Sequence, residues 1–257
     1  MLSPLRTSWE RLQFIRNDER VSKQPVELSV LRLSMANGKA IVISRKEIRA
    51  GLQNQKFSRY SALHIGLQIL AAIQQLHAVG YIHRDIKPAN FCLSLQDAHQ
   101  LVMVDFGMCR KYLDPSSKLI RHPRWFVRGF KGTVRYAALS VHLGRESCRK
   151  DDLESAFYLL VELLVGTLPW MTMEDIVHVE HAKQISRTTN RHEFLSGCPK
   201  QLVHILIYID DLKYYDAPDY ALIRGLLMEA LKKCPENWEF EWEKDERSKT
   251  KSNFFIN

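Results

Sequence analysis

Two short polar segments hold the residues best suited to chemistry. They read His83-Arg84-Asp85-Ile86-Lys87-Pro88-Ala89-Asn90 and Asp105-Phe106-Gly107. A carboxylate can accept a proton, carboxylate and amide oxygens bind hard cations such as Mg²⁺, and an ammonium group attracts phosphate. A site that combined these groups could act on a phosphorylated substrate with the help of a bound metal ion.

The pattern of apolar residues predicts the elements that position these segments. Apolar residues recur every three or four positions from Ser61 to Val79, which predicts a long buried helix that Gly80 ends. Short β-like runs follow at 81–82, 91–93 and 101–104. The first segment is therefore expected on a loop between the helix and a strand, and the second directly after another strand.

Other parts of the chain also have clear patterns. Apolar helices are expected over 152–166, 201–212 and 220–233. Upstream, two apolar-rich runs at 26–35 and 39–44 flank Asn37-Gly38, a strong β-hairpin signal. Residues 1–25 are polar with little periodicity.

Composition excludes several classes of protein. The 257 residues are 46% apolar and 26% charged, which excludes disorder, collagen-like repeats and disulfide-stapled miniproteins. The five cysteines lie far apart with no C-x-x-C pair, so a reduced intracellular compartment is expected. The longest apolar run, 157–170, is broken by Glu162, and residues 1–12 lack a signal-peptide core. We expect a cytoplasmic or nuclear protein without a membrane segment.

Positive charge is concentrated in one stretch. Residues 109–150 contain eleven lysines and arginines against Asp114 and Glu146, a local net charge of +9 in a chain whose total is +8. Such a block attracts nucleic acid, membrane headgroups, or an acidic or phosphorylated peptide. The alternative is a solvated basic surface with no ligand.

The two polar segments resemble the catalytic loop H-R-D-x-x-x-x-N and the D-F-G motif of protein kinases, in the same order and structural context. Within the kinases, the chain resembles the casein kinase 1 superfamily, and most closely its tau-tubulin kinase branch. The residues that carry this likeness are Gly129-Phe130-Lys131-Gly132-Thr133-Val134-Arg135-Tyr136-Ala137, Arg149-Lys150-Asp151-Asp152-Leu153-Glu154-Ser155, Leu168-Pro169-Trp170 and Pro218-Asp219-Tyr220. The likeness extends from about 57 to 244.

The resemblance implies a role for each polar residue. Asp85 would accept the proton of a substrate hydroxyl, and Lys87, typical of serine/threonine kinases, would reach the γ-phosphate of ATP. Asn90 and Asp105 would hold the Mg²⁺ ions that bridge the phosphates. Thr133 would hydrogen-bond near Asp85 and favour serine or threonine acceptors.

Further positions have expected roles by the same resemblance. Cys92 would pack as the apolar floor beneath adenine. Asp152, expected to open its helix, would anchor the backbone of the catalytic loop, or would be a plain helix N-cap. His83 is interpreted as structural, without a proton-transfer role. The residues that would face an acidic or phosphorylated substrate are Arg128, Lys131 and Arg135.

The upstream part of the kinase pattern is not found in the sequence. The glycines before Asp85 are at 38, 51, 66 and 80, so G-x-G-x-x-G cannot be formed. Among Lys23, Lys39, Lys46 and Lys56, Lys23 loosely resembles the strand lysine, but Pro25 interrupts that strand. The chain resembles an intact large lobe joined to a truncated or replaced small lobe.

These observations predict an α+β protein-kinase-like fold, with a mostly helical large lobe and a remnant β-hairpin. The expected divisions are a leader at 1–25, a remnant small lobe and hinge at 26–56, the large lobe at 57–245 and a tail at 246–257. The expected function is a monomeric serine/threonine protein kinase that uses ATP and Mg²⁺ on acidic or primed proteins. The alternative is a catalytically impaired kinase-like binding module. Nucleic-acid binding ranks last, because no nucleic-acid module surrounds the basic stretch.

Overall fold

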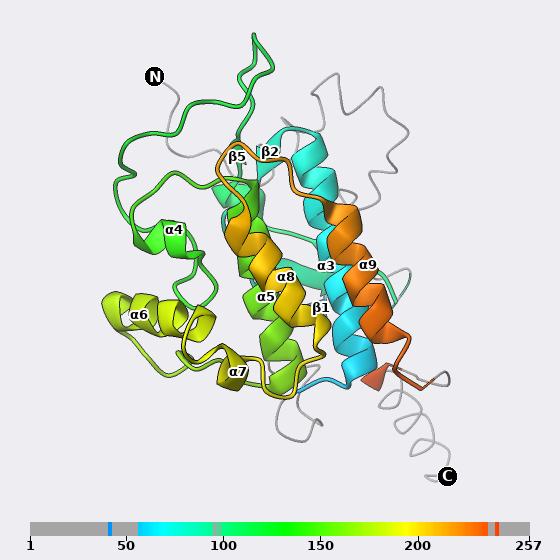
Figure 1. Cartoon of the computed structure of the whole chain (residues 1–257). Helices are drawn as coiled ribbons and strands as arrows, with labels where there is room; N and C mark the ends of the chain where they lie inside the picture. The colour runs from blue at the N-terminus through cyan, green and yellow to red at the C-terminus, as the bar shows by residue number, and fades with distance from the viewer. Residues whose placement is uncertain (1–40, 43–55, 95–96, 98, 236–239, 242–257) are drawn as a thin grey trace, which may run out of the picture.

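The computed structural model describes residues 41–42, 56–94, 97, 99–235 and 240–241 (Figure 1). Its helices are α3 (Arg59–Ala78), α4 (Leu139–His142), α5 (Arg149–Val165), α6 (Ile176–Arg187), α7 (Arg191–Phe194), α8 (Gln201–Asp211) and α9 (Tyr220–Leu231). The strands are β1 (Ile41–Val42), β2 (Tyr81–Ile82), β3 (Phe91–Leu93), β4 (Leu101–Met103) and β5 (Arg110–Lys111), and two 3₁₀ turns are η3 (Pro88–Asn90) and η4 (Phe106–Met108).

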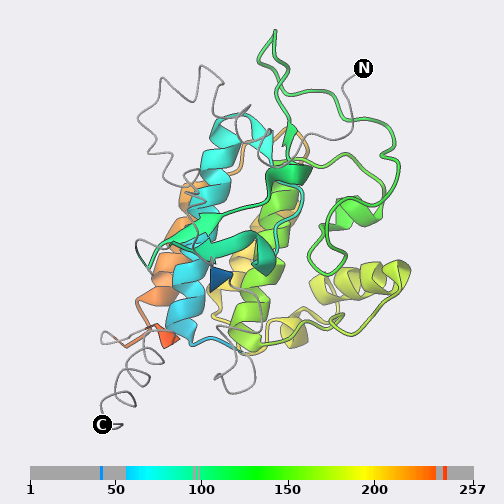
Figure 2. The same cartoon turned by 180° about the vertical axis from the view of Figure 1, so that it is seen from behind.

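Two long helices form the centre of the described fold. Helix α3 packs against both α5 and α9, and α8 covers the other side of α5 and α9 (Figure 1). Ser58 caps α3 by accepting from the amide of Ser61, and Gly80 follows its end with φ of 87°. Side chains from α3 and α5 dominate the buried apolar cluster. The strands lie across these helices (Figure 2), and several of their apolar side chains join the same buried cluster.

The strands form two small antiparallel sheets. In the first, the order is β1-β3-β4, and in the second β2 pairs with β5. Side chains alternate across the first sheet, so Phe91, Leu93, Leu101 and Met103 join the buried apolar cluster. The catalytic-loop residues lie between β2 and β3, and each end of that loop is therefore held by a different sheet.

Most of the predicted elements are confirmed. The helix expected over 61–79 is α3, the strands expected at 81–82 and 91–93 are β2 and β3, and the helices expected over 201–212 and 220–233 are α8 and α9. The strand expected at 101–104 ends one residue earlier. The strand expected at 39–44 is described at 41–42, where it pairs with β3. Its predicted hairpin partner at 26–35, the leader at 1–25, Lys23, Lys39, Lys46 and the tail at 246–257 lie outside the described residues.

The prediction for the helix over 152–166 is wrong at its start. Helix α5 begins at Arg149 after the N-cap Cys148, and Asp151 accepts a hydrogen bond from the amide of Cys148. Asp152 therefore lies inside the first turn and is neither the opening residue nor the N-cap. Helices α4, α6 and α7 were not predicted. Among the residues of known placement, no helix has the length and apolar character needed to cross a bilayer.

Candidate active site

Asp85 lies at the centre of a group of polar side chains from two separate segments. Its carboxylate accepts from the Lys87 ammonium at 2.6 Å and from the Thr133 hydroxyl at 2.8 Å. Lys87 also lies 3.3 Å from the hydroxyl of Thr133. The predicted hydrogen bond between Thr133 and Asp85 is confirmed, although Thr133 is 48 residues beyond Asp85. The carboxylate is 8% exposed, so these partners fix its orientation at the surface of the site.

Asn90 and Asp105 are brought together by the ladder that joins β3 to β4. The amide of Val104, next to Asp105, donates to the carbonyl of Asn90 at 2.8 Å. The Asn90 side chain donates its NH₂ group to the carbonyl of Asp85 at 2.8 Å, which leaves the side-chain oxygen of Asn90 available. Asp105 has φ of 58° and is an exposed residue just past the strand end, where its carboxylate accepts from the Gly107 amide at 3.2 Å. Two oxygen donors thus lie at adjacent strand ends, a donor set suited to Mg²⁺.

Asp152 anchors the backbone of the catalytic loop, as the resemblance implied. Its two carboxylate oxygens accept from the amides of His83 at 2.7 Å and Arg84 at 2.8 Å. His77, on the last turn of α3, donates to the same carboxylate at 2.9 Å, and the Tyr220 hydroxyl lies 2.7 Å from the other ring nitrogen of His77. Burial favours the neutral acid, but these hydrogen bonds outweigh it and lower the pKa of Asp152. The carboxylate is therefore a fixed anion beneath the loop.

His83 has the structural role expected of it. The ring is fully buried, its Nε2 lies 3.3 Å from the Val104 carbonyl, and its Nδ1 accepts from the amide of Asp85 at 3.3 Å. Burial lowers the pKa of His83, so the ring is neutral and bridges the two segments.

Gly132 allows the segment that carries Thr133 to approach the catalytic loop. Its φ is 102°, and a Cβ built there would lie 2.7 Å from the carbonyl oxygen of Arg84. Only glycine avoids both the strained backbone and this clash. Gly132 belongs to the run 129–137 that carries the family likeness, but no role was predicted for it.

We expect Gly132→Ala to lower the free energy of unfolding by about 3 kcal/mol, because backbone strain adds to overpacking. Chemical denaturation measures this loss. Gly129→Ala is the matched control, since Gly129 also has a positive φ of 72° but has nothing within 4 Å of its Cβ position. That variant should lose only about 1 kcal/mol. Equal losses in the two variants would show that the close approach is unimportant.

Lys183, on α6, binds the backbone of the segment that follows Thr133. This side chain is fully buried, and its ammonium donates to the carbonyls of Val134 at 2.7 Å and Ala137 at 2.6 Å. His142 lies 3.1 Å away on α4. Burial lowers the pKa of Lys183 to about 7. No sequence signal distinguishes this lysine from a surface one.

The lowered pKa of the buried Lys183 predicts that stability depends on pH. Between pH 7 and pH 9 the unfolded chain keeps a proton on Lys183 that the folded chain has lost, so unfolding becomes less favourable as pH rises. We expect wild type to gain about 2 kcal/mol relative to Lys183→Met over this interval. Denaturant titrations of both proteins at each pH measure the difference. Lys200→Met, at an exposed position, should show no such change.

The remaining predicted site residues are Cys92, Arg128, Lys131 and Arg135. Cys92 is buried in β3 opposite Val102 of β4, on the sheet face that does not join the main apolar cluster. Burial raises the pKa of the Cys92 thiol, which fits packing better than reactivity. Arg128 is exposed and Lys131 is half-buried. Arg135 donates to the carbonyl of Met171 at 3.1 Å, so one of its N–H groups is already used within the chain.

Comparisons with known proteins agree with this geometry. A family model described as the protein kinase domain matches residues 27–233. A probable serine/threonine-protein kinase of Dictyostelium discoideum is 33% identical over 201 residues, which is 77% of this chain and 40% of the relative. The serine/threonine-protein kinase spe-6 of Caenorhabditis elegans is 35% identical over 217 residues, 80% of this chain and 56% of the relative. Casein kinase I homolog 3 of Schizosaccharomyces pombe is 33% identical over 196 residues, 73% of this chain and 44% of the relative. The chain thus spans about half the length of these relatives.

Proposed function

This chain belongs to the protein kinase family, and we propose that it acts as a serine/threonine kinase of the casein kinase 1 group, closest to the tau-tubulin branch. It would transfer the γ-phosphate of ATP to a protein hydroxyl. The observation that carries the proposal is the Asp85 carboxylate, which Lys87 and Thr133 hold at hydrogen-bond distance from either side. Homologues named casein kinase I support the group.

The residues present fit a nucleotide with its metal. Asn90 and Asp105 would hold Mg²⁺ through a side-chain amide oxygen and a carboxylate, the hard ligands this ion prefers. When bound, ATP and Mg²⁺ would supply the transferable phosphoryl group and neutralise the charge that develops on it. Cys92 would lie beneath the adenine ring as part of the apolar floor.

The protein's own groups would position the acceptor and take up its proton. Asp85 would receive the proton of the substrate hydroxyl, because its carboxylate is already oriented by three side chains. Thr133 would fix the carboxylate from the side of the incoming substrate. Lys87 would place a positive charge beside Asp85, where it can stabilise the transferred phosphate.

The proposal is tested by incubating the purified chain, and a version joined to a complete kinase small lobe, with ATP, Mg²⁺ and an acidic serine peptide. Mass spectrometry should detect phosphate on serine. The absence of transfer by both proteins would contradict the proposal.

We propose that substrates are acidic or already phosphorylated. Lys131 shares one small hollow with Arg84 and Arg145, and Arg128 is exposed nearby in sequence. Arginine and lysine bind carboxylates and phosphates through charge-assisted hydrogen bonds, which salt weakens when the groups are exposed.

Accordingly, Lys131→Ala and Arg135→Ala should each reduce the preference for acidic over neutral peptides about threefold to tenfold, the effect of one partly exposed charge pair. A peptide array read at low and physiological salt measures the preference. Lys200→Ala, which removes an exposed charge elsewhere, should leave it unchanged. An unaltered acidic preference in both site variants would remove these residues from substrate recognition.

A second candidate function rests on the glycine spacing upstream of Asp85, which cannot form G-x-G-x-x-G. On this view the chain is a kinase-like binding module with weak or no turnover, and residues 26–56 replace a full small lobe. Loss of the phosphate clamp would slow transfer by orders of magnitude. A chain that binds Mg²⁺–ATP in a thermal-shift assay without transferring phosphate would favour this candidate.

We further propose that the protein is a monomer located in the cytoplasm or nucleus.

A further inference from the structure

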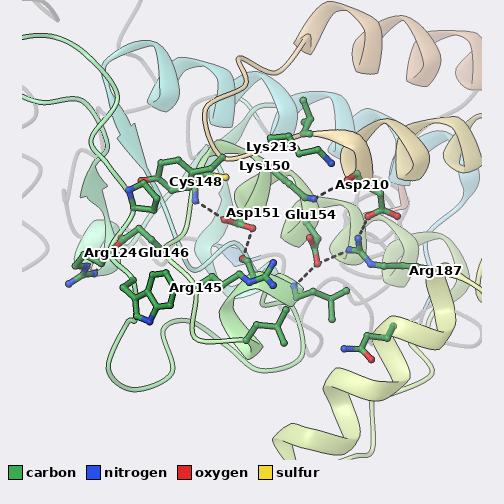
Figure 3. A pocket seen from close by; sticks show the side chains of 18 of the residues that line it. Arg124, Arg145, Glu146, Cys148, Lys150, Asp151, Glu154, Arg187, Asp210 and Lys213 are labelled. Carbon is green, nitrogen blue, oxygen red and sulfur yellow. Dashed lines mark hydrogen bonds and ion pairs between the residues drawn. The ribbon is translucent and has the colours of Figure 1, made fainter.

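A second cavity lies away from Asp85 and its partners. It encloses about 870 Å³ between the loop before α4, α4 itself, the first turn of α5, the end of α6 and the end of α8 (Figure 3). None of the residues assigned above to phosphoryl transfer lines it. A volume of this size is enough for a drug-sized group or a few side chains of a peptide.

The acidic groups in the cavity wall already have partners. Asp151 accepts from the Ser140 hydroxyl at 2.6 Å and from the Cys148 amide at 2.6 Å. Glu154 accepts from the amide of Leu139 at 2.7 Å and pairs with Arg187 at 2.6 Å. Figure 3 shows these contacts along the wall of the cavity. These carboxylates therefore need no bound cation, and they disfavour a deeply inserted polyanion.

Two other acidic groups of the wall are paired with arginines. Glu146 is 7% exposed and pairs with Arg124 and, at 3.4 Å, with Arg110. Asp210 pairs with Arg187. Glu146, Glu154 and Asp210 are thus paired with arginines, the last two sharing Arg187, while Asp151 is held by hydrogen bonds alone.

Three basic side chains at the cavity make fewer hydrogen bonds and ion pairs than the acidic ones. Arg145 and Lys213 are exposed, and within the described residues neither side chain has a hydrogen bond or ion pair. Lys150 uses one donor, to the carbonyl of Asp210 at 3.2 Å. Figure 3 shows that the three cations come from different segments around the same cavity. They provide several free donors for carboxylates.

Apolar side chains complete the lining and extend beyond it. Trp125 is fully exposed, Leu143 is 46% exposed, and Leu139, Leu212 and Tyr214 also face the cavity. A large exposed aromatic ring beside a cavity is typical of a protein–protein contact. Trp125 lines the edge of the cavity, so a small ligand confined there would leave most of its ring in water, whereas a peptide that leaves the cavity past this ring would cover it.

We propose that this cavity docks an acidic segment of a protein partner, with one large apolar side chain inserted and flanking carboxylates bound by Arg145, Lys150 and Lys213. Arg145 and Glu146 also border the small hollow that contains Lys131, but none of the residues assigned to phosphoryl transfer lines the docking cavity, so docking can be tested by binding alone. Asp151 and Glu154 in the wall argue against a polyanion that fills the cavity, whereas the exposed Arg145 and Lys213 can bind carboxylates on either side of one inserted apolar side chain.

The probe is a fluorescein-labelled peptide, Gly-Glu-Asp-Phe-Glu-Asp-Gly, titrated with the full chain and followed by anisotropy. We expect Lys213→Ala and Trp125→Ala each to weaken its affinity about fivefold or more, the effect of one rim charge or one aromatic contact. Lys200→Ala and Leu119→Ala are the matched controls. Lys200→Ala removes an exposed lysine outside the cavity and Leu119→Ala an exposed apolar side chain outside it, and both variants should bind the peptide as wild type does.

Two peptide analogues keep the test independent of any protein variant. Replacing the acids by Asn and Gln, or Phe by Gly, should each weaken binding about fivefold or more. The proposal is overturned if wild type does not bind the parent peptide below about 1 mM, a very weak affinity. It is also overturned if the analogues or cavity variants bind as tightly as their controls, or if a single-stranded oligonucleotide of equal length binds more tightly than the peptide.

Discussion

Asp85→Asn should reduce phosphoryl transfer by about a thousandfold or more, since general-base catalysis contributes about 10²–10⁴ and the lysine beside it loses its partner. The reason lies in the arrangement around one carboxylate. Asparagine keeps an oxygen for the Thr133 hydroxyl, which donates to Asp85 at 2.8 Å, so the fold should be preserved. It replaces the oxygen facing Lys87 by an NH₂ group that cannot take a proton.

The measurement is the initial rate with ATP, Mg²⁺ and an acidic serine peptide, on the chain joined to a complete small lobe. Asp211→Asn is the control, because Asp211 is an exposed carboxylate at the end of α8. It should retain the wild-type rate. Circular dichroism melts should agree for all three proteins. A variant at position 85 that kept its activity would show that this carboxylate is not the base.

The helices and strands around the site were predictable because their signals are local. Helix α3 has a continuous apolar stripe, and buried residues fill most of α5, so a spacing of three and four suffices to find them. Helix α6 differs because it buries only Val179, Lys183 and Ser186. Such a helix depends on tertiary contacts, which its own sequence does not display.

The candidate catalytic residues were predictable for a different reason. Asp85, Lys87 and Asn90 are close in sequence and form a recognisable motif, although the hydrogen bonds that join them were not predicted. The resemblance implied the anchoring role of Asp152, but the contacts of His77 and Lys183 were not predicted. His77 meets Asp152 across 75 residues, and Lys183 meets Ala137 across 46. Pairings of that range arise only when the helices pack.

Of the substitutions discussed, removal of the Asp152 carboxylate should destabilise the fold most. We expect Asp152→Ala to lower the free energy of unfolding by about 3–5 kcal/mol, as removal of one member of a buried charged network does. The substitution would leave the amides of His83 and Arg84 without acceptors and would remove the partner of His77. These hydrogen bonds hold the backbone of the catalytic loop in place. We therefore expect the rate of phosphoryl transfer to fall together with the free energy of unfolding.

The local cause can be separated from general destabilisation. Amide hydrogen exchange at His83 and Arg84 should accelerate in Asp152→Ala, since these two N–H groups donate to the lost carboxylate. Asp211→Ala, at an exposed position on α8, should change neither stability nor exchange. The pKa of Asp152 is lowered in the folded chain, so its stabilising effect is complete above the ordinary value of about 3.9 and is lost as pH falls. The difference between wild type and Asp152→Ala should therefore shrink in acid. A difference that stayed constant from neutral pH down to about pH 3 would show that the buried charge does not hold the loop.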